Sequence, residues 1–90
     1  MSGQKDGHTA AHLQVTVLLF AGLRERLGAD RSEQTVAAGT TVADLYAQMF
    51  PVGPQGRLPV MFALDQCYVS GTTALHDGAE VAFIPPLGGG

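Results

Sequence analysis

The chain ends in a segment whose residue types suit a specific chemistry: positions 85–90 read PPLGGG. Glycine has no Cβ, so Gly88 and Gly89 can thread a slot too narrow for other residues. Six residues also reach roughly 20 Å in extended form. Such a tail can deliver the Gly90 carboxylate into the active site of another protein. We therefore assign the chemistry to Gly90 and the threading to Gly88 and Gly89.

The residues before these glycines are candidates for contact with a partner: Pro85, Pro86 and Leu87. The two prolines favour a stiff, extended base for the tail. Leu87 is apolar and lies beyond the last predicted strand, where a partner can cover it. Only 14% of the residues are charged, against about 25% in typical soluble domains. We expect some apolar surface to be covered by a partner.

Other reactive side chains lack a spacing that supports chemistry. The three histidines form no metal-ligand pattern: His8, His12 and His76. No metal site is predicted. Cys67 lies beside a predicted turn with no histidine or lysine near it in sequence, so we interpret it as an ordinary strand cysteine rather than a sulfur relay. Asp77 and Glu80 are expected to be turn and surface residues rather than an acid–base pair.

Length and charge restrict the class of protein. Ninety residues suffice for one small domain and exclude the larger enzyme architectures. The net charge is −3 and the five basic residues are scattered, which argues against nucleic-acid binding. No apolar run approaches the ~20 residues of a membrane helix. One cysteine suits a reducing compartment, and residues 1–12 carry no secretion signal, so cytosol is the expected location.

Periodicity predicts five strands and two helices. Apolar alternation begins at Leu13, and Thr41 and Asp44 have the spacing of a helix capping box. Gly28 and Pro51 are placed to end the two helices. The predicted strands cover residues 13–20, 33–37, 60–64, 67–69 and 81–84, and the helices cover 21–27 and 42–50.

The arrangement of these elements predicts an α+β fold of the β-grasp, ubiquitin-like kind, with a mixed sheet and one main crossing helix. The most apolar runs are residues 15–20 and 81–84, and strands buried on both faces lie at the centre of a sheet. We expect these two strands to be parallel neighbours. Residues 1–12 form a disordered lead-in, 13–84 the β-grasp domain and 85–90 a flexible tail.

Three sequence segments resemble the MoaD/ThiS family of sulfur-carrier proteins. They are VTVLLFAGLRERLG near the start, GTTVADLYAQM on the main helix and FALDQCYVSGTTALHDGAEVAFIPPLGGG at the end. The resemblance covers Val15 to Gly90. This chain departs from the family pattern at Asp65, where Asn is more frequent, and at Gly88, where a slightly larger residue is usual.

The resemblance implies a carrier without bound cofactors. In the family, an adenylating enzyme of the ubiquitin-activating type uses ATP to activate the terminal glycine, and a persulfide sulfur then displaces AMP. The resulting thiocarboxylate donates sulfur to cyclic pyranopterin monophosphate in the large subunit of molybdopterin synthase. Both proteins are therefore expected partners, and the catalytic residues are expected on the large subunit.

Other functions remain open from sequence alone. The same carrier chemistry serves thiazole synthesis, cysteine synthesis or tRNA thiolation in related proteins. A ubiquitin-like modifier would attach Gly90 to lysines of other proteins, although chain building is disfavoured because Lys5 is the only lysine. A plain interaction domain with an incidental glycine end is the remaining alternative, and it predicts indifference to removal of Gly89 and Gly90.

Overall fold

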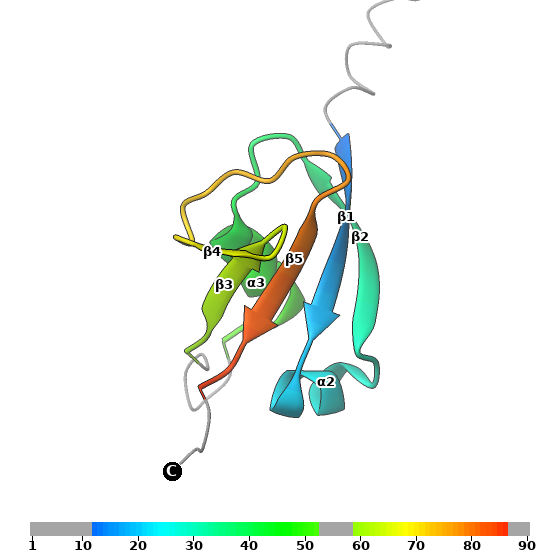
Figure 1. Ribbon diagram of the computed structural model, residues 1–90. Helices are drawn as coiled ribbons and strands as arrows, with labels where there is room; N and C mark the ends of the chain where they lie inside the picture. The colour runs from blue at the N-terminus through cyan, green and yellow to red at the C-terminus, as the bar shows by residue number, and fades with distance from the viewer. Residues whose placement is uncertain (1–11, 53–58, 87–90) are drawn as a thin grey trace, which may run out of the picture.

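The computed structural model describes residues 12–52 and 59–86. Within these ranges the chain forms one five-stranded sheet and two helices (Figure 1). The elements are β1 (His12–Leu19), α2 (Ala21–Leu27), β2 (Arg31–Ala37), α3 (Val42–Met49), β3 (Met61–Leu64), β4 (Cys67–Val69) and β5 (Glu80–Ile84). The strand order is β2-β1-β5-β3-β4. This is the predicted β-grasp fold, with β1 starting one residue and β2 two residues before the predicted strands.

The centre of the sheet is a parallel pair, as the sequence predicted. β1 runs alongside β5, with Thr16 opposite Glu80 and Leu19 opposite Phe83. The other neighbours are antiparallel: β2 on β1, β3 on β5, and β4 on β3. β2, which carries few apolar residues, lies at one edge as expected, and the three-residue β4 lies at the other.

Local sequence explains where α3 begins and where α2 ends. Thr41 Oγ1 accepts a hydrogen bond from the Asp44 N–H, and the Asp44 carboxylate accepts one from the Thr41 N–H, both at 3.1 Å. This reciprocal capping box satisfies amide donors that would otherwise have no partner at the start of α3. Gly28 ends α2 in the left-handed conformation, with φ of 82°, which glycine adopts without strain.

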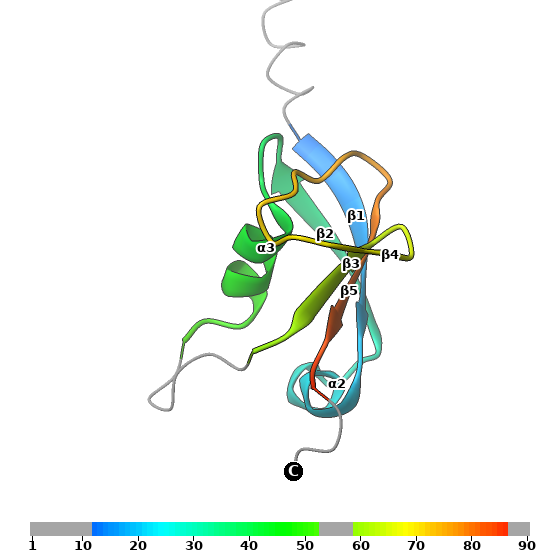
Figure 2. The same ribbon diagram turned by 60° about the vertical axis from the view of Figure 1, so that its left-hand side comes forward.

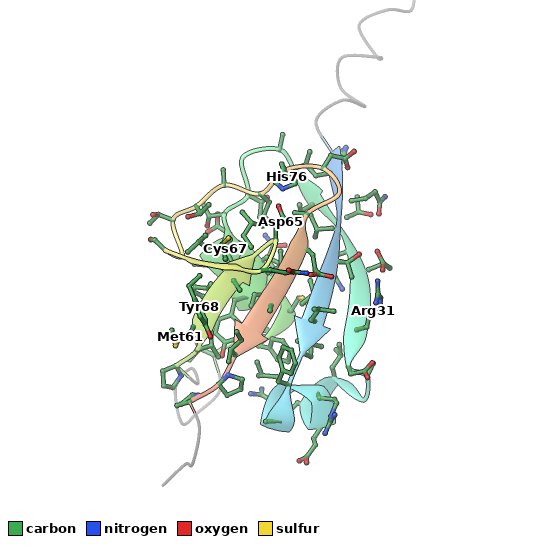
Figure 3. All side chains as sticks on the ribbon, viewed as in Figure 1. Arg31, Met61, Asp65, Cys67, Tyr68 and His76 are labelled. Carbon is green, nitrogen blue, oxygen red and sulfur yellow. The ribbon has the colours of Figure 1, made fainter. Side chains whose placement is uncertain are left out.

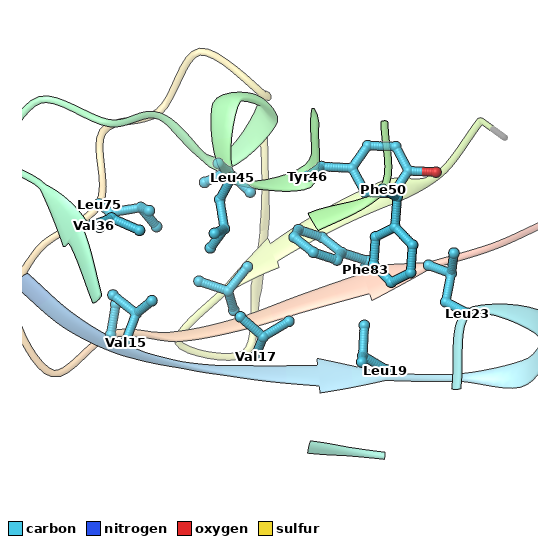
Figure 4. Close-up of a cluster of buried hydrophobic side chains, with 13 residues drawn as sticks. Val15, Val17, Leu19, Leu23, Val36, Leu45, Tyr46, Phe50, Leu75 and Phe83 are labelled. Atoms are coloured by element: carbon cyan, nitrogen blue, oxygen red, sulfur yellow. The ribbon is translucent and has the colours of Figure 1, made fainter. Parts of the chain in front are cut away.

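The core lies between one face of the sheet and α3 (Figures 2 and 4). Alternate residues of the central strands point into it, among them Val17 and Phe83, which are fully buried. Tyr46 on α3 packs against Phe83 with ring centroids 5.0 Å apart. Phe50, just after α3, meets the same ring edge-on. This aromatic cluster anchors β5 beneath the main helix.

One prediction about burial was wrong. Leu18 and Phe20 make the far end of the predicted strand 13–20 apolar on both faces, from which we expected burial on both faces; β1 in fact ends at Leu19, and Phe20 is the N-cap residue of α2. The strand is central, but Leu18 is only half-buried and Phe20 is 45% exposed. The described elements cover one face of the sheet only, with α3, and leave the other open (Figure 2).

Across residues 12–52 and 59–86, no helix has both the length and the apolar character required to span a bilayer.

Candidate functional site

β5 fixes the origin of the C-terminal tail. Its residues are hydrogen-bonded to β1 on one side and to β3 on the other, so the strand that leads into the tail is held by two neighbours. Pro85 is half-buried and Pro86 is exposed immediately after the strand. Leu87, Gly88, Gly89 and Gly90 lie outside the described residues, so their assigned roles stay predictions.

The open face of the sheet presents a shallow apolar hollow of about 220 Å³. Leu18 and Ala82 are opposite each other on the parallel strands and form its floor. Tyr68 on β4 lies opposite Ala63 on β3 and forms one side, with 66% of its surface exposed. The full lining is Leu18, Phe20, Ala63, Gln66, Tyr68, Glu80, Ala82 and Ile84.

Apolar surface extends from this hollow to the root of the tail. Met61, opposite Ile84 in the sheet, is 55% exposed (Figure 3). Together with Pro59 and Val60 it lines a second apolar hollow that includes Pro86. A protein that covers the open face can therefore also contact the base of the tail. We call the residues Leu18, Phe20, Met61, Tyr68, Ala82 and Ile84 the docking face.

Charged groups border the docking face on the side of β2. A further hollow beside Phe20 is lined by Arg24, Asp30 and Arg31 together with Leu18 and Leu19. Arg31 forms a weak surface ion pair with Glu33, at 3.8 Å. On this side the face has a polar border around its apolar centre, as protein–protein interfaces usually have.

The β3–β4 hairpin, which carries Tyr68, is connected to β5 through Asp65. The Asp65 N–H donates to the Glu80 carbonyl at 2.8 Å, and Asp65 Oδ1 accepts from the Glu80 N–H at 3.0 Å. Oδ2 lies 2.6 Å from Nε2 of His76. The hydrogen bond from the Glu80 amide and then that from His76 lower the pKa of the Asp65 carboxyl. Hydrogen bonds to Asp65 and to the Asp77 carbonyl raise the pKa of His76.

The other sequence candidates lie apart from this face or have structural roles. Asp77 accepts a hydrogen bond from the Gln14 N–H at 2.8 Å, consistent with its predicted turn role. Cys67 is exposed on β4 and unpaired. Within the described part of the chain, no three His, Cys, Asp or Glu side chains gather as metal ligands would. His8 lies outside that part.

The sequence predicted that a partner covers some apolar surface, but it located this contact at the tail residues and did not identify the docking face. The signal was present: β1 and β5 are apolar at positions that face both sides of the sheet, yet the helices among residues 12–52 and 59–86 leave one face uncovered. Such a pattern indicates either a second covering layer or an external partner. Phe20 and Ile84 are the apolar residues that indicate this uncovered face. The sequence had instead predicted Phe20 to be a buried residue of the first strand.

Comparisons with known proteins agree with this geometry. The model of the ThiS family matches residues 17–90. The molybdopterin synthase sulfur carrier subunit of Chlamydomonas reinhardtii is 40% identical, with 87% of this chain and 100% of the relative covered. The subunit of the same name from Mycobacterium tuberculosis is 38% identical, covering 87% and 99%.

Solved structures show the same fold. Small archaeal modifier protein 1 of Haloferax volcanii has a TM-score of 0.71 at 23% identity, covering 83% of this chain and 99% of that one. A putative molybdopterin converting factor subunit 1 of Pyrococcus furiosus has a TM-score of 0.67 at 27% identity, covering 83% and 99%. A Helicobacter pylori complex of subunits 1 and 2 of molybdopterin-converting factor contains a chain with a TM-score of 0.54 at 22% identity, covering 87% and 100%.

Proposed function

The chain belongs to the ThiS family, and from that premise we propose that it is the sulfur carrier subunit of a molybdopterin synthase. The observation that carries the proposal is its 40% identity to such a subunit over the whole length of that relative. Gly90 is the residue on which sulfur travels. An adenylating partner converts its carboxylate to an acyl-adenylate with ATP, which releases pyrophosphate. A donor of sulfur at the oxidation level of sulfide then attacks the acyl carbon, and AMP leaves to give a thiocarboxylate.

The proposed chemistry requires that the terminal carboxylate be activated and that the sulfur stay attached to the tail. It does not require catalytic side chains on this chain. A carboxylate becomes a useful electrophile only when its oxygen is turned into a good leaving group, which is the role of ATP on the adenylating enzyme. The sulfur stays bound to a tail rooted in β5, so proximity replaces a high concentration of free sulfide. Gly88 and Gly89 thread the partner's active site. No cofactor is bound by this chain in the proposed mechanism.

The large subunit of molybdopterin synthase is the proposed acceptor, where the thiocarboxylate donates sulfur to cyclic pyranopterin monophosphate. The Helicobacter pylori structure is a complex of subunits 1 and 2, and we propose the same kind of assembly here. The docking face supports this because it is apolar, uncovered by the described elements and continuous with the tail root at Met61 and Pro86. We place the protein in the cytosol, without nucleic acid or membrane as partners.

Intact mass spectrometry tests the proposal most directly. The full chain is incubated with the cognate adenylating enzyme, ATP and a sulfur donor, alongside a variant lacking Gly90. A mass gain equal to sulfur replacing oxygen, mapped to Gly90 and absent from the truncation, is expected. Equal loading of the truncated chain would refute the carrier role. Isopeptide adducts to other proteins in place of the thiocarboxylate would identify a protein modifier instead.

A further inference from the structure

His76 is placed between two oxygens that can only accept hydrogen bonds. Its Nε2 lies 2.6 Å from the Asp65 carboxylate, and its Nδ1 lies 3.0 Å from the Asp77 carbonyl oxygen (Figure 3). Neutral imidazole has one N–H, so it can donate to only one of them. The imidazolium form has two and satisfies both. The contacts themselves therefore select the protonated ring.

The charged groups around this ring favour the same form. Asp65 approaches from the β3–β4 turn, and Asp77 lies on the histidine's own segment; both raise its pKa by their charges as well as through the hydrogen bonds. The Asp65 carboxylate is in turn kept ionised by the Glu80 amide and by His76. His76 and Asp65 thus form a charge-assisted pair with both partners in their charged states.

This pair holds the turn that supports one side of the docking face. Asp65 and Gln66 both have positive φ, at 51° and 73°, so the turn depends on tertiary contacts as well as on residue preference. Asp65 contacts Glu80 through its backbone and one carboxylate oxygen, while the other oxygen contacts His76. Gln66 and Tyr68, which follow Asp65 in the chain, line the hollow together with Glu80.

We propose that His76 and Asp65 are positioning residues for the docking face: the imidazolium–carboxylate pair clasps the β3–β4 hairpin against the start of β5. Loss of the His76 proton removes the positive charge that faces the Asp65 carboxylate as well as one of the ring's two hydrogen bonds, and so loosens the hairpin. Partner binding then weakens as pH rises. The identity of the partner as the large subunit rests on the proposed function, whereas the clasp itself does not.

The pH window follows from the direction of both shifts. His76 has a raised pKa, so its contribution is complete below the ordinary value of 6.5 and is lost as pH rises through the folded-state pKa. Asp65 has a lowered pKa, so its contribution is present above the ordinary value of 3.8 and is lost as pH falls through the folded-state pKa. The clasp is strongest between these limits.

NMR on the full chain tests the clasp without any partner. The two ring nitrogens of His76 are followed through a pH titration, together with hydrogen-exchange protection of the β3–β4 amides. In the wild type both nitrogens stay protonated to a higher pH than in an unperturbed histidine, because the pKa of His76 is raised above its ordinary value of 6.5. Protection of the hairpin amides falls by about two- to fivefold on deprotonation, the size expected for one exposed charged contact.

Asp65→Asn is the informative variant because it keeps the Oδ1 acceptor for the Glu80 amide and suits the turn. Its NH₂ group can donate to Nε2 of neutral His76, while Nδ1–H still donates to Asp77. The titration midpoint of His76 should therefore fall, and hairpin protection should no longer decrease as pH rises. Glu25→Gln on α2, an exposed site with the same charge change, should leave both unchanged.

Binding to the large subunit is then measured on both sides of the His76 midpoint. Weaker binding at the higher pH in the wild type, by about the same two- to fivefold, and a flat profile in Asp65→Asn are expected. An unshifted midpoint in Asp65→Asn, or identical pH profiles for wild type and variant, overturns the clasp. Absence of binding at every pH contradicts the proposed function, and the NMR result then decides on the clasp alone.

Discussion

Tyr68→Ala is the sharpest test of the docking face. Tyr68 is 66% exposed on β4, and a tyrosine buries about 200 Å² when fully covered. About 130 Å² of it therefore remains available to a partner. At about 25 cal/mol per Å² this is worth ~3 kcal/mol if a partner covers all of the remainder, and ~1.5 kcal/mol if it covers half. The dissociation constant for the large subunit should rise about 10- to 150-fold.

Calorimetric titration against the large subunit measures this loss, with three comparisons. Tyr68→Phe keeps the apolar ring and should bind nearly as well as the wild type. Gln48→Ala, exposed on α3 at the opposite face of the sheet, should not change the affinity. Thermal unfolding should show little loss of stability in Tyr68→Ala, because the side chain packs outside the core. An affinity within about twofold of wild type would refute the assignment of Tyr68 to the interface.

Three further changes test the fold by denaturant unfolding. Gly71→Ala should destabilise the protein by about 1–3 kcal/mol, because a Cβ there would lie 3.0 Å from both Ala43 and Phe62; full stability would contradict this close packing. Gly22→Ala meets nothing within 4 Å on α2 and should stabilise by about 0.5 kcal/mol. Thr41→Ala removes the cap of α3 and should cost about 1 kcal/mol; an unchanged midpoint would show that the cap is dispensable.

The sequence predicted the order of elements because several boundaries have a local cause. Thr41 and Asp44 begin α3, Gly28 ends α2, and alternating apolar residues define the strands. The parallel pairing of β1 with β5 also followed, since these are the two most apolar strands. The exposure of the open face of the sheet could not be predicted from the sequence. An apolar residue such as Phe20 gives the same pattern whether a helix of this chain or another protein covers it.

The contact between His76 and Asp65 could not be predicted for a different reason. The two residues are eleven positions apart in irregular segments, where no periodicity relates one side chain to another. Only the folded hairpin, with Asp65 in a positive-φ turn beside the start of β5, brings the carboxylate to the ring. Asp65 stands where the family more often has Asn. Both residues suit such a turn, so turn preference alone does not explain why this chain has Asp there.

Because one C-terminus must serve two partners in turn, the affinity of the docking face for either partner is limited. In the proposed cycle, Gly90 must enter the adenylating enzyme to receive sulfur and then leave it to enter the large subunit. Binding that is too tight at either step would hold the tail in one active site, since affinity differences between related complexes are mostly differences in dissociation rate. A shallow hollow with a partly exposed floor at Leu18 and Ala82 suits such exchange better than a deep pocket. The firm attachment of β5 to β1 and β3 then ensures that whichever partner covers the face receives the tail from the same origin.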